Sequence, residues 1–200
     1  MRKLSWFAVL VVLCLATTAF ADNIVFDLSP AGWFTNRDPG LGVGQGVSVQ
    51  TTQTINDMSF YLNLPDGGDL KFMVWNATND SLLYLNEVDG IAASQNPSWI
   101  SSSPFDLTLE AGNTYYFGVI SDSNALIGYI FPVIDYSANG LTAIKTGNSN
   151  YDGYNIPTYS GDGTAQIALR LSTVPEPGSM VLLGTGALGL AAALRRKLLL

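Results

Sequence analysis

The chain has 200 residues, a formal net charge of −7, no histidine and a single cysteine. The missing histidine excludes catalytic triads and metal sites built on imidazole, and one cysteine excludes intramolecular disulfides, iron–sulfur clusters and cysteine zinc sites. Only 12% of the residues are charged and the mean hydropathy is +0.24, which indicates apolar segments beside any soluble domain.

Residues 1–21 have the three parts of a secretory signal peptide. Arg2 and Lys3 form the basic start, and an apolar run follows them. Ala19 and Ala21 are the small residues that a signal peptidase accepts at positions −3 and −1 of its cleavage site. The sequence therefore predicts cleavage after Ala21.

An uncleaved anchor and a lipoprotein signal are the alternatives for this segment. The apolar run is short for a helix that stays in the membrane. A lipoprotein signal needs a small residue before its cysteine, but Leu13 precedes Cys14. We therefore expect a mature chain without cysteine, which suits an oxidising compartment.

Residues 22–173 are expected to form one all-β domain. Apolar and polar residues alternate in four segments, which is typical of strands with one buried face; these are 58–64, 70–75, 105–110 and 166–171. Residues 114–121 and 127–134 are apolar on both faces, as central strands are, although Pro132 limits the pairing of the second. The pattern predicts an antiparallel β-sandwich of jelly-roll type.

Turn residues separate these predicted strands. Residues 65–69 and 110–113 are rich in Gly, Asp and Asn, and we expect both to be β-hairpin loops. The second lies within residues 107–117, which resemble a hairpin of many secreted sandwich domains. The alternating glycines of residues 40–46 are expected to form a flexible edge segment, because the helix that a phosphate-binding loop requires does not follow them.

The predicted domain is strongly acidic, with 15 acidic against four basic side chains and a net charge of −11. This charge repels nucleic acid, and it repels anionic polysaccharide unless a cation bridges the two. Asp66, Asp69, Asp152 and Asp162 lie in predicted loops and offer oxygen ligands for a structural calcium ion. Asp is also a common turn residue, and no EF-hand loop is present, so no cofactor is assigned.

Aromatic residues in apparent loops are the candidates for carbohydrate binding, because the C–H faces of sugars pack against aromatic rings. They are Trp33, Tyr151, Tyr154 and Tyr159, with Phe34 and Trp99 in similar positions. The alternative is that these rings fold back and cover the ends of the core.

An enzyme is not expected from the available side chains. A glycosidase needs two positioned carboxylates, and the domain has only two glutamates, Glu87 and Glu110. Glu110 falls in a predicted tight turn. Without histidine or cysteine, few pairs of nucleophile and base remain, so a secreted hydrolase is the least favoured function.

Residues 174–200 contain three consecutive signals. Val174, Pro175, Glu176 and Pro177 come first, and the two prolines keep this segment extended. Residues 178–194 follow without a charge and would span roughly 25 Å as a helix, at the short end for a membrane-spanning segment. The basic Arg195, Arg196 and Lys197 come last and are expected to stay in the cytoplasm, which places the predicted domain across the membrane.

This ordered tail resembles the PEP-CTERM sorting tail. The resemblance implies that an exosortase-type peptidase recognises and processes the chain, and that the host makes exopolysaccharide. A GPI signal would have a polar spacer and no basic end, and a cell-wall sortase signal would carry an LPxTG-like motif, which is absent. A plain C-terminal anchor with a chance PEP tripeptide stays open.

The sequence as a whole predicts an exported surface or extracellular-matrix protein. The precursor would be anchored in the inner membrane and then reach the cell surface or the medium. Its role would be structural or adhesive and associated with exopolysaccharide, with a carbohydrate-binding module as the alternative. The expected partners are the membrane, the exosortase-type peptidase and exopolysaccharide, and not nucleic acid.

Overall fold

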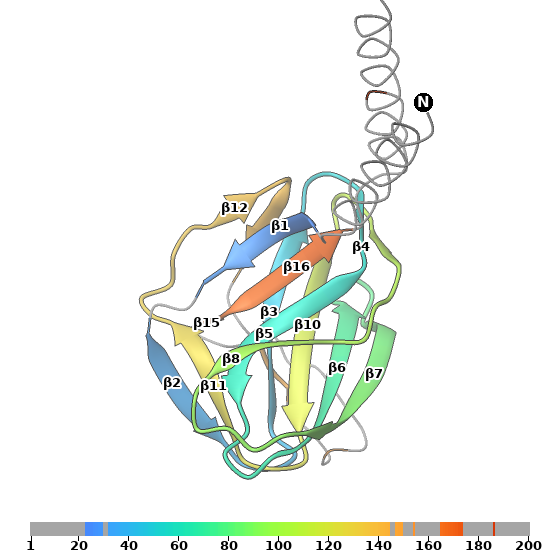
Figure 1. The fold of residues 1–200 in the computed structure, drawn as a ribbon. Coiled ribbons are helices and arrows are strands. Elements are labelled where there is room, and N and C mark those ends of the chain that lie inside the picture. Colours follow the sequence, from blue (N-terminus) through green and yellow to red (C-terminus); the bar gives the residue numbers. More distant parts are fainter. Residues whose placement is uncertain are drawn as a thin grey trace, which may run out of the picture. The chain divides into compact units, whose positions relative to one another are not determined.

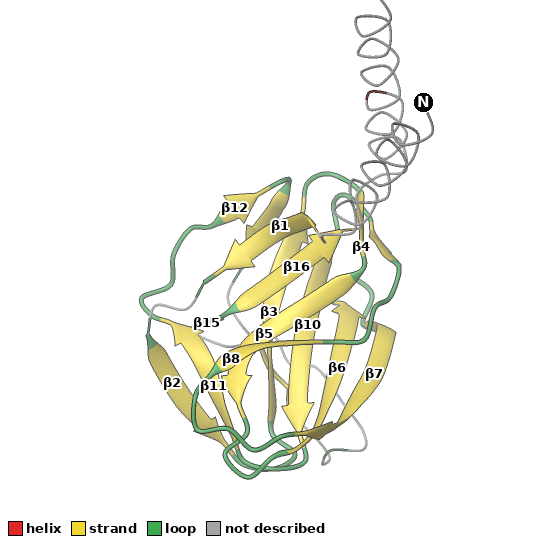
Figure 2. Cartoon of the chain, viewed as in Figure 1, coloured by secondary structure: helices red, strands yellow, loops and turns green. Residues whose placement is uncertain are grey.

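The computed structural model describes residues 23–29, 32–144, 147–149, 154, 165–173 and 186. Ile24–Thr173 form one compact unit (Figure 1). Every regular element in the described part of this unit is a β-strand (Figure 2), which confirms the predicted all-β class. The predicted signal peptide, with Ala19 and Ala21, lies outside the described residues.

Sheet A has the strand order β1-β16-β5-β11-β15, with β2 paired to β11 and β8 paired to β5. Its strands are β1 (Asn23–Leu28), β2 (Trp33–Arg37), β5 (Asp57–Asn63), β8 (Ser98–Ser101), β11 (Ala125–Ile130), β15 (Gln166–Ile167) and β16 (Leu169–Thr173). The pairs of β5 with β8, β11 and β16 are all antiparallel.

Sheet B has the order β12-β13-β3-β10-β6-β7, with β14 paired to β3. Its strands are β3 (Gly42–Val49), β6 (Gly68–Asn76), β7 (Ser81–Ile91), β10 (Thr114–Ser121), β12 (Ser137–Ala138), β13 (Leu141–Ala143) and β14 (Gly147–Ser149). A small antiparallel pair, β4 (Gln53–Ile55) with β9 (Leu107–Leu109), completes the described strands.

One hydrophobic core lies between sheets A and B. Phe60 of β5 and Phe72 of β6 are fully buried, and their ring centroids are 6.2 Å apart. Their neighbours on the same faces, Leu62 and Val74 among them, are buried with them, as the alternation predicts. The arrangement fits the predicted β-sandwich, and the jelly-roll connectivity stays a prediction.

Both predicted hairpin loops prove to be connections between sheets. The turn at 65–69 leads from β5 in sheet A to β6 in sheet B. The turn at 110–113 leads from β9, which pairs with β4, to β10, which pairs with β3 and β6. The hairpin predictions, including the resemblance over residues 107–117, are therefore wrong. Turn residues reverse the chain, but they do not decide which strand accepts the backbone hydrogen bonds.

The contacts of the 110–113 turn explain its course. The Glu110 N–H donates to the hydroxyl of Tyr115 at 2.8 Å. The Gly112 N–H donates to the carbonyl of Val49 at 2.8 Å, and the Val49 N–H donates to Asn113 at 3.0 Å. The turn is therefore attached to the end of β3, and β10 starts beside β3 instead of beside β9.

The glycine-rich segment is an interior strand, so the prediction of a flexible edge is wrong. β3 pairs with β10 on one side and with β13 and β14 on the other. A β-carbon at Gly44 would overlap the ring of Tyr116 and the carbonyl of Phe117. Tyr116 is fully buried, so the glycine is needed for this ring to lie against the strand.

Three predicted strands also differ from the structure, two in where they end and one in its continuity. β9 covers only Leu107–Leu109, and β11 ends at Ile130, before Pro132. The predicted strand at 166–171 is divided at Ala168. The Ala168 N–H donates to Gly128 of β11 at 3.1 Å, while its carbonyl accepts from the Tyr61 N–H of β5 at 3.4 Å, so the chain changes partners at this residue.

Replacing Gly44 by Ala is expected to destabilise the protein by about 3 kcal/mol, because neither the Tyr116 ring nor the Phe117 backbone has room to move in a packed sheet. Denaturant unfolding of the purified chain measures the change. Ser48→Ala on the same strand is the control and should cost within about 0.5 kcal/mol. Equal stabilities of the Gly44→Ala variant and the wild type would contradict the close approach.

Candidate functional site

The outer face of sheet A carries three aromatic rings in contact, which we call the aromatic row. Tyr61 of β5 and Trp99 of β8 are register partners, and their ring centroids are 5.3 Å apart. Phe34 of β2 lies 6.0 Å from Tyr61. Three strands therefore contribute to one continuous apolar surface.

The strand period and one glycine place these rings together. Phe60 and Leu62 point into the core, so Tyr61 between them points outward. Gly128 of β11 pairs with Phe34 in the register. A β-carbon at Gly128 would lie 3.0 Å from the Tyr61 carbonyl and 3.6 Å from the Phe34 ring. The bare backbone at this position therefore leaves room for the two rings.

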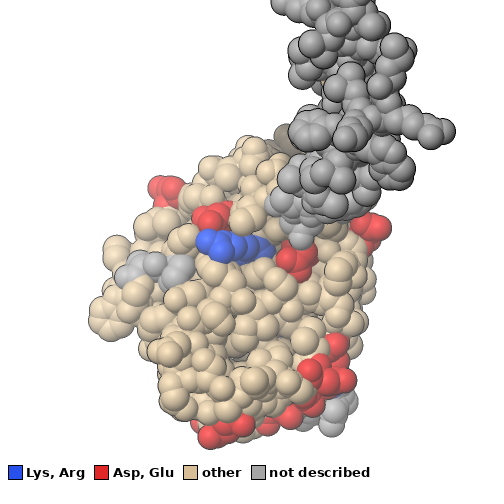
Figure 3. Space-filling model, viewed as in Figure 1, with Lys and Arg blue, Asp and Glu red and all other residues tan. Residues whose placement is uncertain are grey.

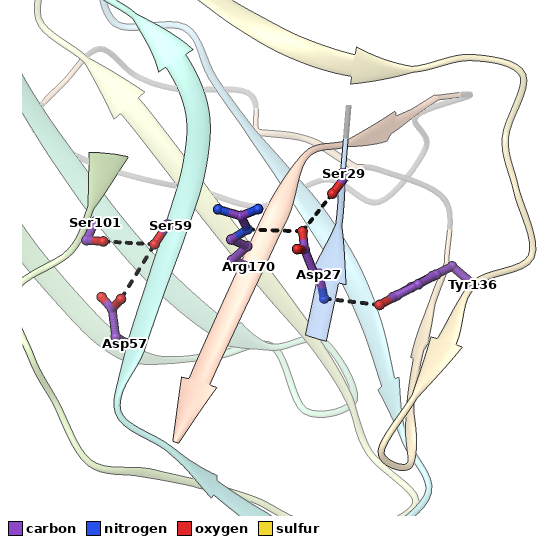
Figure 4. Close-up of polar contacts among 7 residues, drawn as sticks. All are labelled: Asp27, Ser29, Asp57, Ser59, Ser101, Tyr136 and Arg170. Atoms are coloured by element: carbon purple, nitrogen blue, oxygen red, sulfur yellow. Dashed lines mark hydrogen bonds and ion pairs between the residues drawn. The ribbon is translucent and has the colours of Figure 1, made fainter. Parts of the chain in front are cut away.

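Arg170 of β16 lies at the polar side of the row. Its guanidinium carbon is 4.0 Å from the centroid of the Trp99 ring, close enough for a cation–π interaction. Its Nε is 3.1 Å from Oδ1 of Asp27 on β1, an ion pair whose geometry is not that of a hydrogen bond. Asp27 is positioned in turn by the Ser29 hydroxyl at 2.9 Å and by Tyr136, which accepts from its backbone N–H at 3.2 Å (Figure 4).

Hydroxyl groups adjoin the row on the same face. Arg170, Ser59 and Ser101 are successive neighbours across β16, β5 and β8. The hydroxyls of Ser59 and Ser101 are 2.8 Å apart, and the Ser59 hydroxyl donates to Oδ2 of Asp57 at 3.5 Å (Figure 4). On this face one basic patch lies over β16 between two acidic patches, and a broad uncharged surface extends over β5 and β8 (Figure 3).

A group of three carboxylates, the acidic cluster, lies on sheet B. Asp69 of β6 and Glu87 and Asp89 of β7 each place an oxygen within 4.8 Å of the others. Asp69 also accepts the Gly90 N–H at 2.7 Å, which ties it to β7. Of the predicted calcium ligands, Asp69 is in this cluster and Asp66 is not. Asp152 and Asp162 lie outside the described residues, and calcium binding stays a prediction.

Tyr154 lies beside the acidic cluster. Its hydroxyl donates to Oε1 of Glu87 at 2.5 Å. Lys71 donates to the Tyr154 carbonyl at 3.3 Å, and its ammonium is 3.9 Å from the ring centroid. Burial raises the pKa of the Tyr154 phenol, and the bond to Glu87 and its charge raise it further, because both favour the neutral form.

The predicted loop aromatics that the structure describes do not all lie on one surface. Trp33, which is 61% exposed, lies in strand β2 of sheet A and not in a loop. Phe34 and Trp99 are strand residues as well. Tyr154 contacts Lys71 and Glu87 of sheet B instead. Tyr151 and Tyr159 lie outside the described residues.

Two residues of the outer face were not recognised as site candidates in the sequence. Tyr61 and Arg170 are large side chains at outward positions of two strands whose alternation is clear in the sequence. That signal shows that both face away from the core. It does not show that β8 lies beside β5 or that β16 lies on its other side, and those two neighbours bring Trp99 and Arg170 together.

The predicted sorting residues Val174, Pro175, Glu176 and Pro177, the span 178–194 except Gly186, and the basic end 195–197 lie outside the described residues. In the part of the chain that the structure describes, no helix has the length and apolar character that crossing a membrane takes. A family model for the PEP-CTERM protein-sorting motif matches residues 173–197. No curated protein matches the chain.

Replacing Glu87 by Gln is expected to lower the pKa of the Tyr154 phenol, because the negative charge that favours the neutral phenol is lost. An alkaline absorbance titration of the tyrosines measures the change as a tyrosine that ionises at lower pH. Asp66→Asn, which also removes one carboxylate charge in an exposed turn, is the control and should leave the curve unchanged. Overlapping curves for Glu87→Gln and the wild type would show that the contact does not form in solution.

The same raised pKa affects stability above neutral pH. An unfolded chain releases the tyrosine proton near its ordinary value of about 10, before the folded chain does. The contribution of the Tyr154 contact to the free energy of unfolding is therefore fully present below pH ~10. It is lost as the pH rises towards the pKa of the Tyr154 phenol in the folded chain.

Proposed function

Since the chain carries a PEP-CTERM protein-sorting motif and is thus an exported protein that an exosortase processes, we propose that it is a non-enzymatic structural or adhesive component of the cell surface or extracellular matrix, associated with exopolysaccharide. The observation that carries the proposal is the match over residues 173–197, which begins at the last residue of the last strand of the β-domain. The domain is the part of the chain that would remain outside the cell.

Each part of the tail has a role in this proposal. Residues 174–177 are the segment that the peptidase recognises. Residues 178–194 hold the precursor in the membrane, and Arg195, Arg196 and Lys197 keep the chain's end in the cytoplasm. The precursor is therefore anchored with its β-domain on the far side of the membrane, ready for processing and delivery to the surface.

The positions of the two glutamates support a non-enzymatic role. Glu87 accepts from Tyr154 and lies 3.9 Å from Lys71, so its charge is already compensated. Glu110 is exposed in the turn between β9 and β10. The two carboxylates lie in different elements, one on β7 and the other in the turn between β9 and β10, whereas a glycosidase needs two carboxylates positioned around one bond. A secreted hydrolase is therefore the less supported alternative.

Carbohydrate binding is the second candidate function, and the aromatic row is the observation that favours it. Three contacting rings lie on the outer face of sheet A beside hydroxyl, carboxylate and guanidinium groups. A surface of this composition suits a sugar polymer, which presents C–H faces and hydroxyls together. Binding of this kind would make the association with exopolysaccharide direct.

Replacing Pro175, Glu176 and Pro177 together by Ala is expected to stop processing in the host. The precursor should accumulate at full length in the inner-membrane fraction, and the surface and medium fractions should lose the protein. Fractionation followed by immunoblotting measures both size and distribution. A control replaces the same residue types outside the motif, at Pro97, Pro104 and Glu110. An unchanged size and distribution of the motif variant would contradict sorting by this tail.

Association with exopolysaccharide has its own test in a host strain that cannot synthesise the polymer. The processed protein should shift from the matrix fraction to the medium, while its processing stays normal because the tail is unchanged. The same amount of matrix-associated protein in both strains would rule out the proposed association and leave the sorting intact.

A further inference from the structure

We propose that the outer face of sheet A binds a neutral polysaccharide, with Phe34, Tyr61 and Trp99 packing against sugar rings and Arg170 donating hydrogen bonds to their hydroxyls. This inference rests on the proposed function, because it names the residues and the ligand class through which the domain would associate with exopolysaccharide.

The aromatic row is accessible and its rings are held in place before a ligand arrives. Phe34 is 40% exposed, and Tyr61 and Trp99 are half-buried against their neighbours. Contacts at 5.3 and 6.0 Å between the ring centroids restrict their rotation. Rings that are already ordered lose little conformational entropy on binding, which is why rigid aromatic residues are effective in recognition sites.

The polar groups beside the row match the hydroxyls of a sugar. Arg170 is oriented by the Trp99 ring and by Asp27, and its closest contact with Asp27 uses Nε. None of the other residues drawn in Figure 4 bonds its terminal amino groups, and we infer that these groups donate to the ligand. Ser101 is exposed and presents its hydroxyl next to Trp99 on β8, and the buried Ser59 hydroxyl lies 2.8 Å from it and helps to orient it. Each hydroxyl both donates and accepts, as sugar hydroxyls do.

The charges of this face favour a neutral polymer over an acidic one. Arg170 is the one basic residue among the face residues named above, and Asp27 and Asp57 flank it. The domain as a whole carries −11, so a polyanion would be repelled before it reached the row. A second copy of this chain would bring the same negative charge to the interface, which disfavours self-association through this face.

The proposal is tested by affinity electrophoresis of the full-length chain in detergent. The gels contain a β-glucan, a galactomannan, a dextran or the anionic polymer alginate. At least one neutral polymer is expected to retard the chain, and alginate is not. No retardation by any neutral polymer, or retardation by alginate alone, would overturn the proposal.

Variants then assign the binding to the row. Phe34→Ala and Trp99→Ala should each weaken binding about tenfold, and Trp99→Phe should restore most of the loss at its position. Leu85→Ala on β7 is the control, because Leu85 is 45% exposed on sheet B and should bind like the wild type. Phe34 is exposed on an edge strand, so its variant is expected to fold, and thermal unfolding checks this. Equal affinity of the row variants and the wild type would overturn the proposal.

The same variants separate this inference from the proposed function. A Phe34→Ala/Trp99→Ala double variant that still associates with the host matrix, although it no longer binds neutral polymers, would overturn the inference and leave the proposed function standing. A wild-type chain that binds neutral polymers through the row but is absent from the host matrix would overturn the proposed function. The binding of neutral polymers by the row would then still stand. Dimers of the wild type that the double variant abolishes would identify a second copy as the occupant and overturn the inference.

Discussion

The burial of one face of each large sheet against the other is the constraint on which the rest of this structure depends. Phe60 and Phe72 meet in the core from opposite sheets, and each buried aromatic ring of this size contributes about 2–3 kcal/mol to folding. Because side chains alternate along a strand, burying Phe60 forces Tyr61 outward, and burying Leu169 and Leu171 forces Arg170 outward. The candidate binding face is therefore a direct consequence of how the core is packed.

Close approach between strands and rings is the second requirement, and glycine satisfies it at two positions. Gly44 leaves space in sheet B for the buried Tyr116 ring, and Gly128 leaves space in sheet A between Tyr61 and Phe34. Neither glycine sits in a turn, and neither has a positive φ angle. Both act by lacking a side chain, so any larger residue would push an aromatic ring away from the sheet.

The candidate binding face and the sorting motif meet at the last strand of the β-domain. The last strand, β16, supplies Arg170 to the outer face and ends at Thr173, where the match to the sorting motif begins. The motif implies export and processing by an exosortase, and it begins within the last strand of the domain that carries the candidate binding face.

The sequence by itself determined the sorting tail and the all-β class. A sorting motif is recognised by the order of its residues, here Pro175, Glu176, Pro177 and those that follow, so it can be identified from the sequence. Alternation within a strand is also local, which is why the buried faces of β5 and β6 could be predicted. Only the tertiary structure decided that the turns at 65–69 and 110–113 join different sheets, and that Phe34, Tyr61, Trp99 and Arg170 share one face. Strand pairing joins residues far apart in the chain, and the hydrogen bonds that select each neighbour are formed by backbone groups that every residue has in common.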